Sequence, residues 1–228
     1  MNNRAINKRD AVNKMVICGV FAAFAYVCVC VFRIKVSFLT LDIKDAIITT
    51  GAMLISPIAG LAVSIVVAFV EMITISDTSY YGFIMNFLSS ATFSVVASVI
   101  YRGRKNLVFA VTGLVSAAFA MTAVMMLANL FITPFYMGVN IETVAALIPK
   151  LLLPFNLTKA ILNASLVMII YKPIATALRR AKVIKSSSSH GKYGVGVKTI
   201  AVTSVAIAIL ALCLVIFFVV LGADIELF

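Results

Sequence analysis

Long apolar segments alternate with short polar ones along most of the chain. Seven of the apolar segments could form membrane helices, and they lie at residues 15–32, 46–55, 61–75, 81–101, 107–131, 154–171 and 199–221. The second is shorter than the roughly 20 residues that a bilayer-spanning helix needs, so we expect it to start deep or to continue into the Ser-Pro turn that follows. The pattern predicts an all-α membrane protein.

The polar segments divide the chain into four predicted regions. Residues 1–14 form a basic tail, and residues 15–182 form a membrane domain of six helices. Residues 183–198 form a basic, flexible linker rich in Ser and Gly. Residues 199–228 form a seventh membrane helix and a short acidic tail.

The charged residues support the prediction of a membrane protein and indicate its orientation in the membrane. The chain has 19 Lys and Arg residues, 8 Asp and Glu residues and a net charge of +11, yet only 12% of its residues are charged and 63% are hydrophobic. The charges lie at the ends of the apolar segments, which argues against nucleic-acid binding. With the N-terminus inside, 14 of the 19 basic residues are cytoplasmic and seven of the eight acidic residues are outside. The positive-inside rule therefore predicts a cytoplasmic N-terminus.

The stretch at residues 151–160, LLLPFNLTKA, carries the most informative polar residues. Pro154 suits the first turn of a helix, where its missing N–H needs no partner. Asn156, Lys159 and Asn163 then follow at i, i+3 and i+7, on one helical face. A lysine facing lipid would cost about 2.5–3.5 kcal/mol on insertion scales. We therefore expect this face to look into the protein, toward a cavity or a polar partner.

The predicted topology gathers further polar groups at the outer end of the bundle. Asn129, a long connection at residues 133–149 and a short polar loop at residues 33–44 all lie there. They join the face that carries Asn156 and Lys159. Such a gathering is expected for a pocket that opens outward.

Some polar residues have two interpretations. Asp42 and Asp45 are expected in the first turn of a helix, where the dipole favours carboxylates. The alternative is that residues 38–42 form a lid over the outer end of the cavity. Glu71 is either an interfacial residue or an acceptor that lines the cavity. The hydroxyl-rich stretch at residues 89–94 is expected to form hydrogen bonds between helices.

The sequence lacks the motifs of common catalytic sites. It contains no Walker A, HExxH, CxxC or GxSxG motif, and its carboxylates are few and scattered. We therefore expect no enzyme activity and no metal site, and we interpret the four cysteines as apolar fillers: Cys18, Cys28, Cys30 and Cys213. Amides and a lysine bind rather than catalyse, so the residues indicate a binding protein for a neutral, polyhydroxylated solute with a flat ring.

Five segments carry a resemblance to a known family. They are FLTLDIKD (38–45), SPIAG (56–60), MNFLSS (85–90), ANLFITPFYMG (128–138) and LLPFNLTKA (152–160). Taken in order, they resemble the riboflavin-specific S component of energy-coupling-factor (ECF) vitamin transporters, over residues 12–182. The last two segments are the most specific, because an Asn before an aromatic-Pro loop followed by PFN-x-x-K is unusual among membrane proteins.

The resemblance implies a function and a set of residues. The fold would be a six-helix bundle in the bacterial cell membrane, here with an additional C-terminal helix. It would bind riboflavin near the outer face as transported ligand, without a cofactor, and a transmembrane scaffold subunit with two ATPase subunits would supply energy. The implied substrate-binding residues are Leu39, Thr40, Leu41, Asn86, Asn129, Asn156 and Lys159. The implied surface for the scaffold subunit lies around Gly19 and Ala23.

Several alternatives remain open from the sequence. The chain could be an S component for another vitamin or a flavin analogue, or a lipid-modifying enzyme, for which the residues offer no catalytic cluster. It could also be a structural or regulatory subunit in which Lys159 pairs with Glu71. Gly19 and Ala23 could equally serve helix packing within the chain. The resemblance says nothing of residues 199–228.

Overall fold

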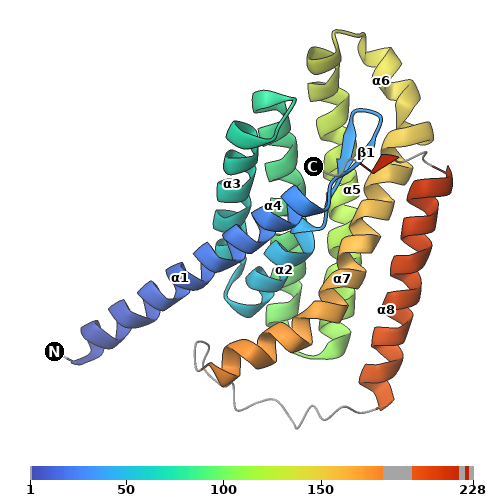
Figure 1. Cartoon of the computed structure of the whole chain (residues 1–228). Helices are drawn as coiled ribbons and strands as arrows, with labels where there is room; N and C mark the ends of the chain where they lie inside the picture. The colour runs from blue at the N-terminus through green and yellow to red at the C-terminus, as the bar shows by residue number, and fades with distance from the viewer. Residues whose placement is uncertain (1, 182–196, 221–223, 226–228) are drawn as a thin grey trace.

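Helices make up nearly all of this computed structural model, which describes residues 2–181, 197–220 and 224–225. The elements in order are α1 (Asn2–Val31), β1 (Ile34–Val36), β2 (Leu39–Leu41), α2 (Lys44–Leu54), α3 (Pro57–Thr74), α4 (Ser79–Gly103), α5 (Leu107–Met137), α6 (Ile141–Leu147), a π-helical segment (Ile148–Leu152), α7 (Leu153–Arg180), α8 (Val197–Val215), a second π-helical segment (Ile216–Val220) and β3 (Asp224–Ile225). Figure 1 shows the helices gathered in one bundle, with α8 alongside α7.

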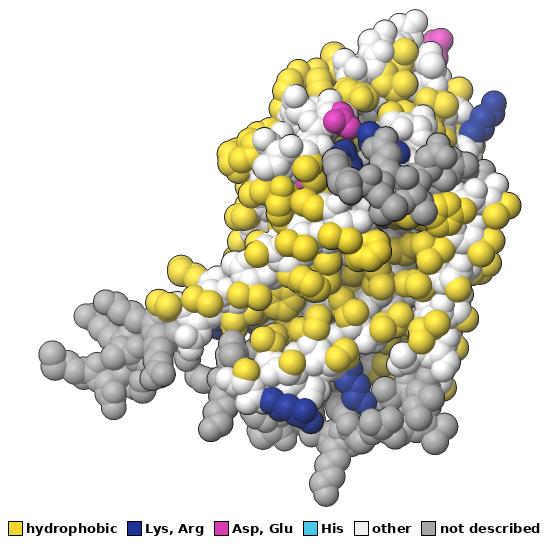
Figure 2. Space-filling view, viewed as in Figure 1, with side chains coloured by type: hydrophobic (Ala, Val, Ile, Leu, Met, Phe, Trp, Pro, Cys, Tyr) yellow, Lys and Arg dark blue, Asp and Glu magenta, His cyan; other side chains and the backbone are white. Residues whose placement is uncertain are grey.

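Within the described residues, six helical stretches are long and apolar enough to cross a membrane. They are residues 11–31, 57–74, 79–103, 107–137, 141–180 and 201–219. Hydrophobic side chains cover the middle of the face seen in Figure 2, and Lys and Arg side chains lie toward its lower and upper parts. The predicted all-α membrane protein is confirmed.

Helix α2 is the short helix that the sequence predicts, and it lies inside the bundle. Ten of its 11 residues are buried, and it packs against α1, α3, α4 and α7. It has Asp45 in its first turn and ends before Ser56, whose Oγ accepts a hydrogen bond from Ala59 N at 3.1 Å. Pro57 opens α3 at a position where no backbone donor is needed. This sharp boundary keeps α2 from extending to full membrane thickness.

The segment expected to be a polar loop at residues 33–44 is instead a β-hairpin. β1 and β2 pair antiparallel with Val36 opposite Leu39, and β3 pairs antiparallel on the other side of β1. Ser37 turns the chain with a positive φ of 56°. Val36 and Leu41 are buried, so the hairpin has one apolar face. Two strands of three residues each give too short an alternation to stand out from a loop.

The predicted connection at residues 133–149 is also wrong, because most of it is helical. Helix α5 continues through Pro134 and ends at Gly138, which has the left-handed φ of 65° typical of a helix end. Gly138 N–H bonds to the carbonyl of Pro134. Helix α6 then leads through the π-helical segment into α7, so the sixth span begins well before the expected Pro154.

The N-terminal segment is helical where a tail was predicted, and the predicted linker before α8 lies mostly outside the described residues. Residues 2–14, expected as a tail, are the first turns of α1, which crosses the bundle obliquely and projects beyond it in Figure 1. The expected linker lies outside the described residues up to residue 196, and α8 begins at Val197.

Helix α8 packs within the chain rather than standing apart from it. The ring of Phe217 is fully buried and meets Phe155 of α7 edge to face, with ring centroids 5.5 Å apart. Cys213, Val36 and Leu41 belong to the same apolar cluster. The seventh helix therefore links α7 to the hairpin, directly through this cluster and again through β3.

This packing predicts that Phe217 holds the hairpin in place. In Phe217→Ala, the hairpin loses one side of its apolar cluster, and the amides of β1 and β2 should exchange hydrogen severalfold faster. The neighbouring Phe218 is half-exposed, so Phe218→Ala is a matched control that should leave this exchange unchanged. Equal protection of the hairpin in both variants would show that α8 does not support it.

Candidate functional site

A cavity of about 260 Å³ lies at one end of the bundle, close in size to the smaller ligand pockets of proteins. It forms where α1, α3 and α5 end and where α4 and α7 begin, with the hairpin beside it. Six of the seven residues that the resemblance implied for substrate binding line it: Leu39, Thr40, Asn86, Asn129, Asn156 and Lys159. The seventh, Leu41, is buried in the apolar cluster with Phe217 and does not line the cavity.

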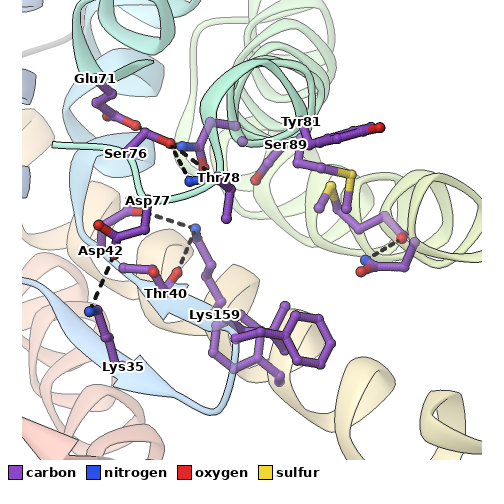
Figure 3. Close-up of a pocket in the computed structure, with 18 of the residues that line it drawn as sticks. Lys35, Thr40, Asp42, Glu71, Ser76, Asp77, Thr78, Tyr81, Ser89 and Lys159 are labelled. Carbon is purple, nitrogen blue, oxygen red and sulfur yellow. Dashed lines mark hydrogen bonds and ion pairs between the residues drawn. The ribbon is translucent and has the colours of Figure 1, made fainter. Parts of the chain in front are cut away.

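The predicted polar face of α7 points into the protein. Asn156, Lys159 and Asn163 are all buried, which confirms the prediction from their spacing. Lys159 Nζ lies 2.9 Å from Asp42 Oδ2 and 3.4 Å from the carbonyl oxygen of Thr40. Figure 3 shows Lys159 extending toward Thr40, which belongs to β2. The lysine thus joins α7 to the segment that follows the hairpin, and its charge is compensated by a carboxylate.

Asn163 holds the same segment from one turn further along α7. Its Nδ2 donates to the carbonyl of Asp42 at 3.2 Å, and its Oδ1 accepts from Ala46 N at 2.9 Å. Asn163 does not line the cavity. It therefore fixes the start of α2, where two otherwise unpaired backbone groups need partners.

A second buried ion pair continues the network away from Lys159. Lys44 Nζ lies 2.7 Å from Glu71 Oε2 and 3.5 Å from Asp42 Oδ2. Asn86 Nδ2 donates to the same Glu71 oxygen at 2.8 Å. Glu71 is only 3% exposed and lines the cavity, so it is not an interfacial residue. Its cation is Lys44, and the alternative in which Lys159 pairs with Glu71 is not what the structure shows.

The hydroxyl-rich stretch of α4 bonds between helices, as predicted. Ser90 Oγ donates to Asp45 Oδ1 through a short contact, and Ser89 Oγ donates to Asp45 Oδ2 at 3.3 Å. Asp45 is fully buried but does not line the cavity. Two hydroxyls thus donate to a buried carboxylate that forms no salt bridge within 4 Å with the described residues.

The mouth of the cavity is crossed by weaker contacts. Arg33 and Lys35 lie 3.6 and 3.3 Å from Asp77 Oδ2, and the Asp77 side chain is 67% exposed. Ion pairs this exposed contribute little to stability. Arg33 also donates to the carbonyl of Ile75 at 2.8 Å. These contacts connect the hairpin to the α3–α4 loop, so the hairpin borders the cavity as a lid would.

Comparison with known proteins identifies the family. The sequence model described as "ECF transporter, substrate-specific component" matches residues 13–171, which include every residue of the cavity. The chain belongs to this family. It is 28% identical over 149 residues to "Riboflavin transporter RibU" of Staphylococcus aureus (strain TCH60), a match that covers 63% of this chain and 78% of the relative.

A comparison of structures supports the same family. A solved structure described as "Structure and mechanism of the S component of a bacterial ECF transporter" superposes with a TM-score of 0.63 at 26% identity, covering 73% of this chain and 98% of that chain. The predicted resemblance is confirmed. This S component is a multi-pass membrane protein, and its helix α8 lies beyond the residues that the family model matches.

Helix α1 of this S component presents two small residues, Gly19 and Ala23, outward. Gly19 and Ala23 are exposed, and a Cβ added at Gly19 would meet no atom within 4 Å. The interpretation that these two residues serve packing within the chain is therefore wrong. Their neighbours Val16, Val20 and Phe24 are also exposed. The result is an apolar helix face with a shallow, small-residue strip.

Sequence reasoning missed Lys44 as part of the site, and it included Asp42 only through the alternative of a lid at residues 38–42. Both line the cavity, and both are almost completely buried. The signal was present, because Lys44 lies between Asp42 and Asp45 in an otherwise apolar stretch. An ionisable cluster in a membrane domain is a functional-site hypothesis by default.

Proposed function

We propose that this S component binds riboflavin from outside the cell and takes part in its uptake. One observation carries the proposal: six residues that the resemblance implied for substrate binding line the same cavity. They are Leu39, Thr40, Asn86, Asn129, Asn156 and Lys159. The similarity of the chain to RibU supports the same substrate. Riboflavin joins a flat ring system to a chain of hydroxyl groups. The cavity offers complementary chemistry for both parts.

The amides suit the hydroxyl groups. Asn129 Nδ2 donates to Met125 O, and Asn156 Nδ2 donates to Leu152 O, each within its own helix. These bonds fix the orientation of both amides. Each amide retains hydrogen-bonding capacity for a ligand that can donate and accept, as a hydroxyl does. Lys159 adds a charge-assisted donor, which is stronger than a neutral one.

The apolar walls suit the ring. Leu39, Met85, Met125 and Phe155 line the cavity beside the polar groups. Phe155 is held from behind by Phe217, so its ring has a fixed place. The cavity therefore combines apolar walls with placed polar groups, as small-molecule sites do.

The orientation in the bacterial cell membrane follows from charge. The loop with Arg102, Arg104 and Lys105 and the basic end of α7 lie at the helix ends opposite the cavity. The positive-inside rule assigns that end to the cytoplasm, together with the N-terminus. The cavity then opens outward.

The energy for uptake comes, in this proposal, from separate subunits. The chain has no Walker A motif. The resemblance implies a transmembrane scaffold and two ATPase subunits, which would drive release on the inner side. No resident cofactor is needed. The scaffold docks on the exposed face of α1, where Gly19 and Ala23 permit a close approach of another helix.

The direct test is a binding measurement with the purified, detergent-solubilised protein. Riboflavin should co-purify and give the visible absorbance of a flavin, and the protein stripped of ligand should quench the fluorescence of added riboflavin at a stoichiometry of one. A panel of other vitamins should compete poorly. A colourless protein that leaves riboflavin fluorescence unchanged would refute the substrate assignment.

Docking through α1 gives a separate prediction. Gly19→Leu should abolish co-purification with the scaffold and ATPase subunits, because a branched side chain would hold the two helices apart. Riboflavin binding should persist, since Gly19 is remote from the cavity. Val108→Leu, at an exposed apolar position of α5 and away from α1, is the control and should assemble normally. Normal assembly of Gly19→Leu would exclude this strip as the docking surface.

A further inference from the structure

The carboxylate of Glu71 has one oxygen fully engaged and one without a partner. Oε2 accepts hydrogen bonds from Lys44 Nζ at 2.7 Å and from Asn86 Nδ2 at 2.8 Å. Oε1 is buried and has no hydrogen-bond partner among the described residues. Buried carboxylate oxygens are normally hydrogen-bonded, because leaving one unpaired forfeits its hydration without replacement.

The unpaired oxygen belongs to a residue that lines the ligand cavity. The Glu71 side chain is 97% buried and reaches the cavity from α3, whereas Asn129, Asn156 and Lys159 reach it from α5 and α7. Figure 3 shows Glu71 and Lys159 entering from different elements. Glu71 therefore places a buried, unpaired acceptor next to the cavity, on a side where the resemblance implied only Asn86.

The contacts with Lys44 and Asn86 hold the carboxylate of Glu71 in place. Lys44 supplies a cation at contact distance, and Lys44 is itself buried and held by Asp42. An ionised carboxylate accepts hydrogen bonds and cannot donate them. As part of a carboxylate, Glu71 Oε1 would therefore favour a ligand group that donates a hydrogen bond.

We infer that Glu71 Oε1 accepts a hydrogen bond from an O–H or N–H group of the bound solute, and that Glu71 thereby determines specificity. The inference rests on the proposed function, because riboflavin has both kinds of donor: the imide N–H of its ring and the hydroxyls of its chain. A site built to accept from a donor discriminates strongly against an analogue that lacks it.

Glu71→Gln tests the inference because its outcome is set by the neighbours. Lys44 and Asn86 both donate to the Oε2 position, so the new amide must keep its oxygen there. Its NH₂ group then takes the place of Oε1 and turns a donor toward the donor of the ligand. Riboflavin binding should weaken by about 10- to 100-fold.

Two riboflavin analogues separate a contact with ligand from a structural effect. N3-methylriboflavin lacks the ring N–H, and lumichrome lacks the hydroxyl chain. If the ring donates, Glu71→Gln should weaken riboflavin and lumichrome but not the N3-methyl compound. If a hydroxyl donates, it should weaken riboflavin and the N3-methyl compound but not lumichrome. An equal loss for all three ligands, or no loss for any, would overturn the inference.

Asp45→Asn is the matched control. Asp45 is an equally buried carboxylate in a neighbouring position, yet it does not line the cavity. Its substitution removes the same charge and should change the affinities for the three ligands by a common factor. Failure of the wild-type protein to bind riboflavin would refute the proposed function. Binding by the wild type with unchanged affinity in Glu71→Gln would refute only the role of Glu71.

Discussion

Lys159→Met is expected to weaken riboflavin binding by about 1.5–3 kcal/mol, the range for hydrogen bonds to charged groups. Methionine keeps the unbranched shape of the side chain but removes its three donors and its charge. Lys159 Nζ lies in the cavity wall, 2.9 Å from Asp42 and within reach of a ligand hydroxyl. The measurement is a fluorescence-quenching titration of the ligand-free protein with riboflavin.

Two variants keep this result interpretable. Lys150→Met removes an exposed lysine at the start of the same helical stretch and should bind riboflavin as the wild type does. Asn156→Ala leaves the ion pairs intact, because its amide bonds only to the carbonyl of Leu152 among the described residues, and it should still lose about 1 kcal/mol or more of binding. If Lys159→Met and Asn156→Ala both bind with unchanged affinity, the cavity is not the riboflavin site.

Features with local causes could be predicted from the sequence. The inward face of α7 follows from the spacing of Asn156, Lys159 and Asn163 and from the cost of a lysine in lipid. The short α2 follows from an apolar run that ends at Ser56 and Pro57. In both cases the residues that decide the structure lie within a few turns of each other.

Features that depend on distant partners could not be predicted in the same way. Lys44 and Glu71 are 27 residues apart, and their contact exists only because α2 packs inside the bundle against α3. β3 is separated from β1 by almost the whole chain. The helix through Pro134 was missed for a different reason. Proline usually disrupts a helix interior, whereas Pro134 lies in the last turn of α5, close to the end of the helix at Gly138.

The burial of Lys44 leads to the largest expected effect on stability. Lys44 is 1% exposed and is the cation nearest to Glu71. In Lys44→Met, Asp42 still has Lys159 at 2.9 Å, but among the described residues Glu71 keeps only the hydrogen bond from the neutral Asn86. Removing one partner of a buried ion pair costs about 3–5 kcal/mol, because the other charge is left uncompensated. The free energy of unfolding in detergent, measured without ligand, should fall by this amount.

A second substitution should restore much of that loss. In Lys44→Met combined with Glu71→Gln, the uncompensated carboxylate is replaced by a neutral amide that still accepts from Asn86. A buried pair replaced on both sides is often nearly neutral in stability. The double variant should therefore be more stable than Lys44→Met alone, and the coupling energy of the cycle should be large because the two side chains are in contact. If the losses of unfolding free energy in Lys44→Met and Glu71→Gln simply add in the double variant, Lys44 does not compensate the charge of Glu71.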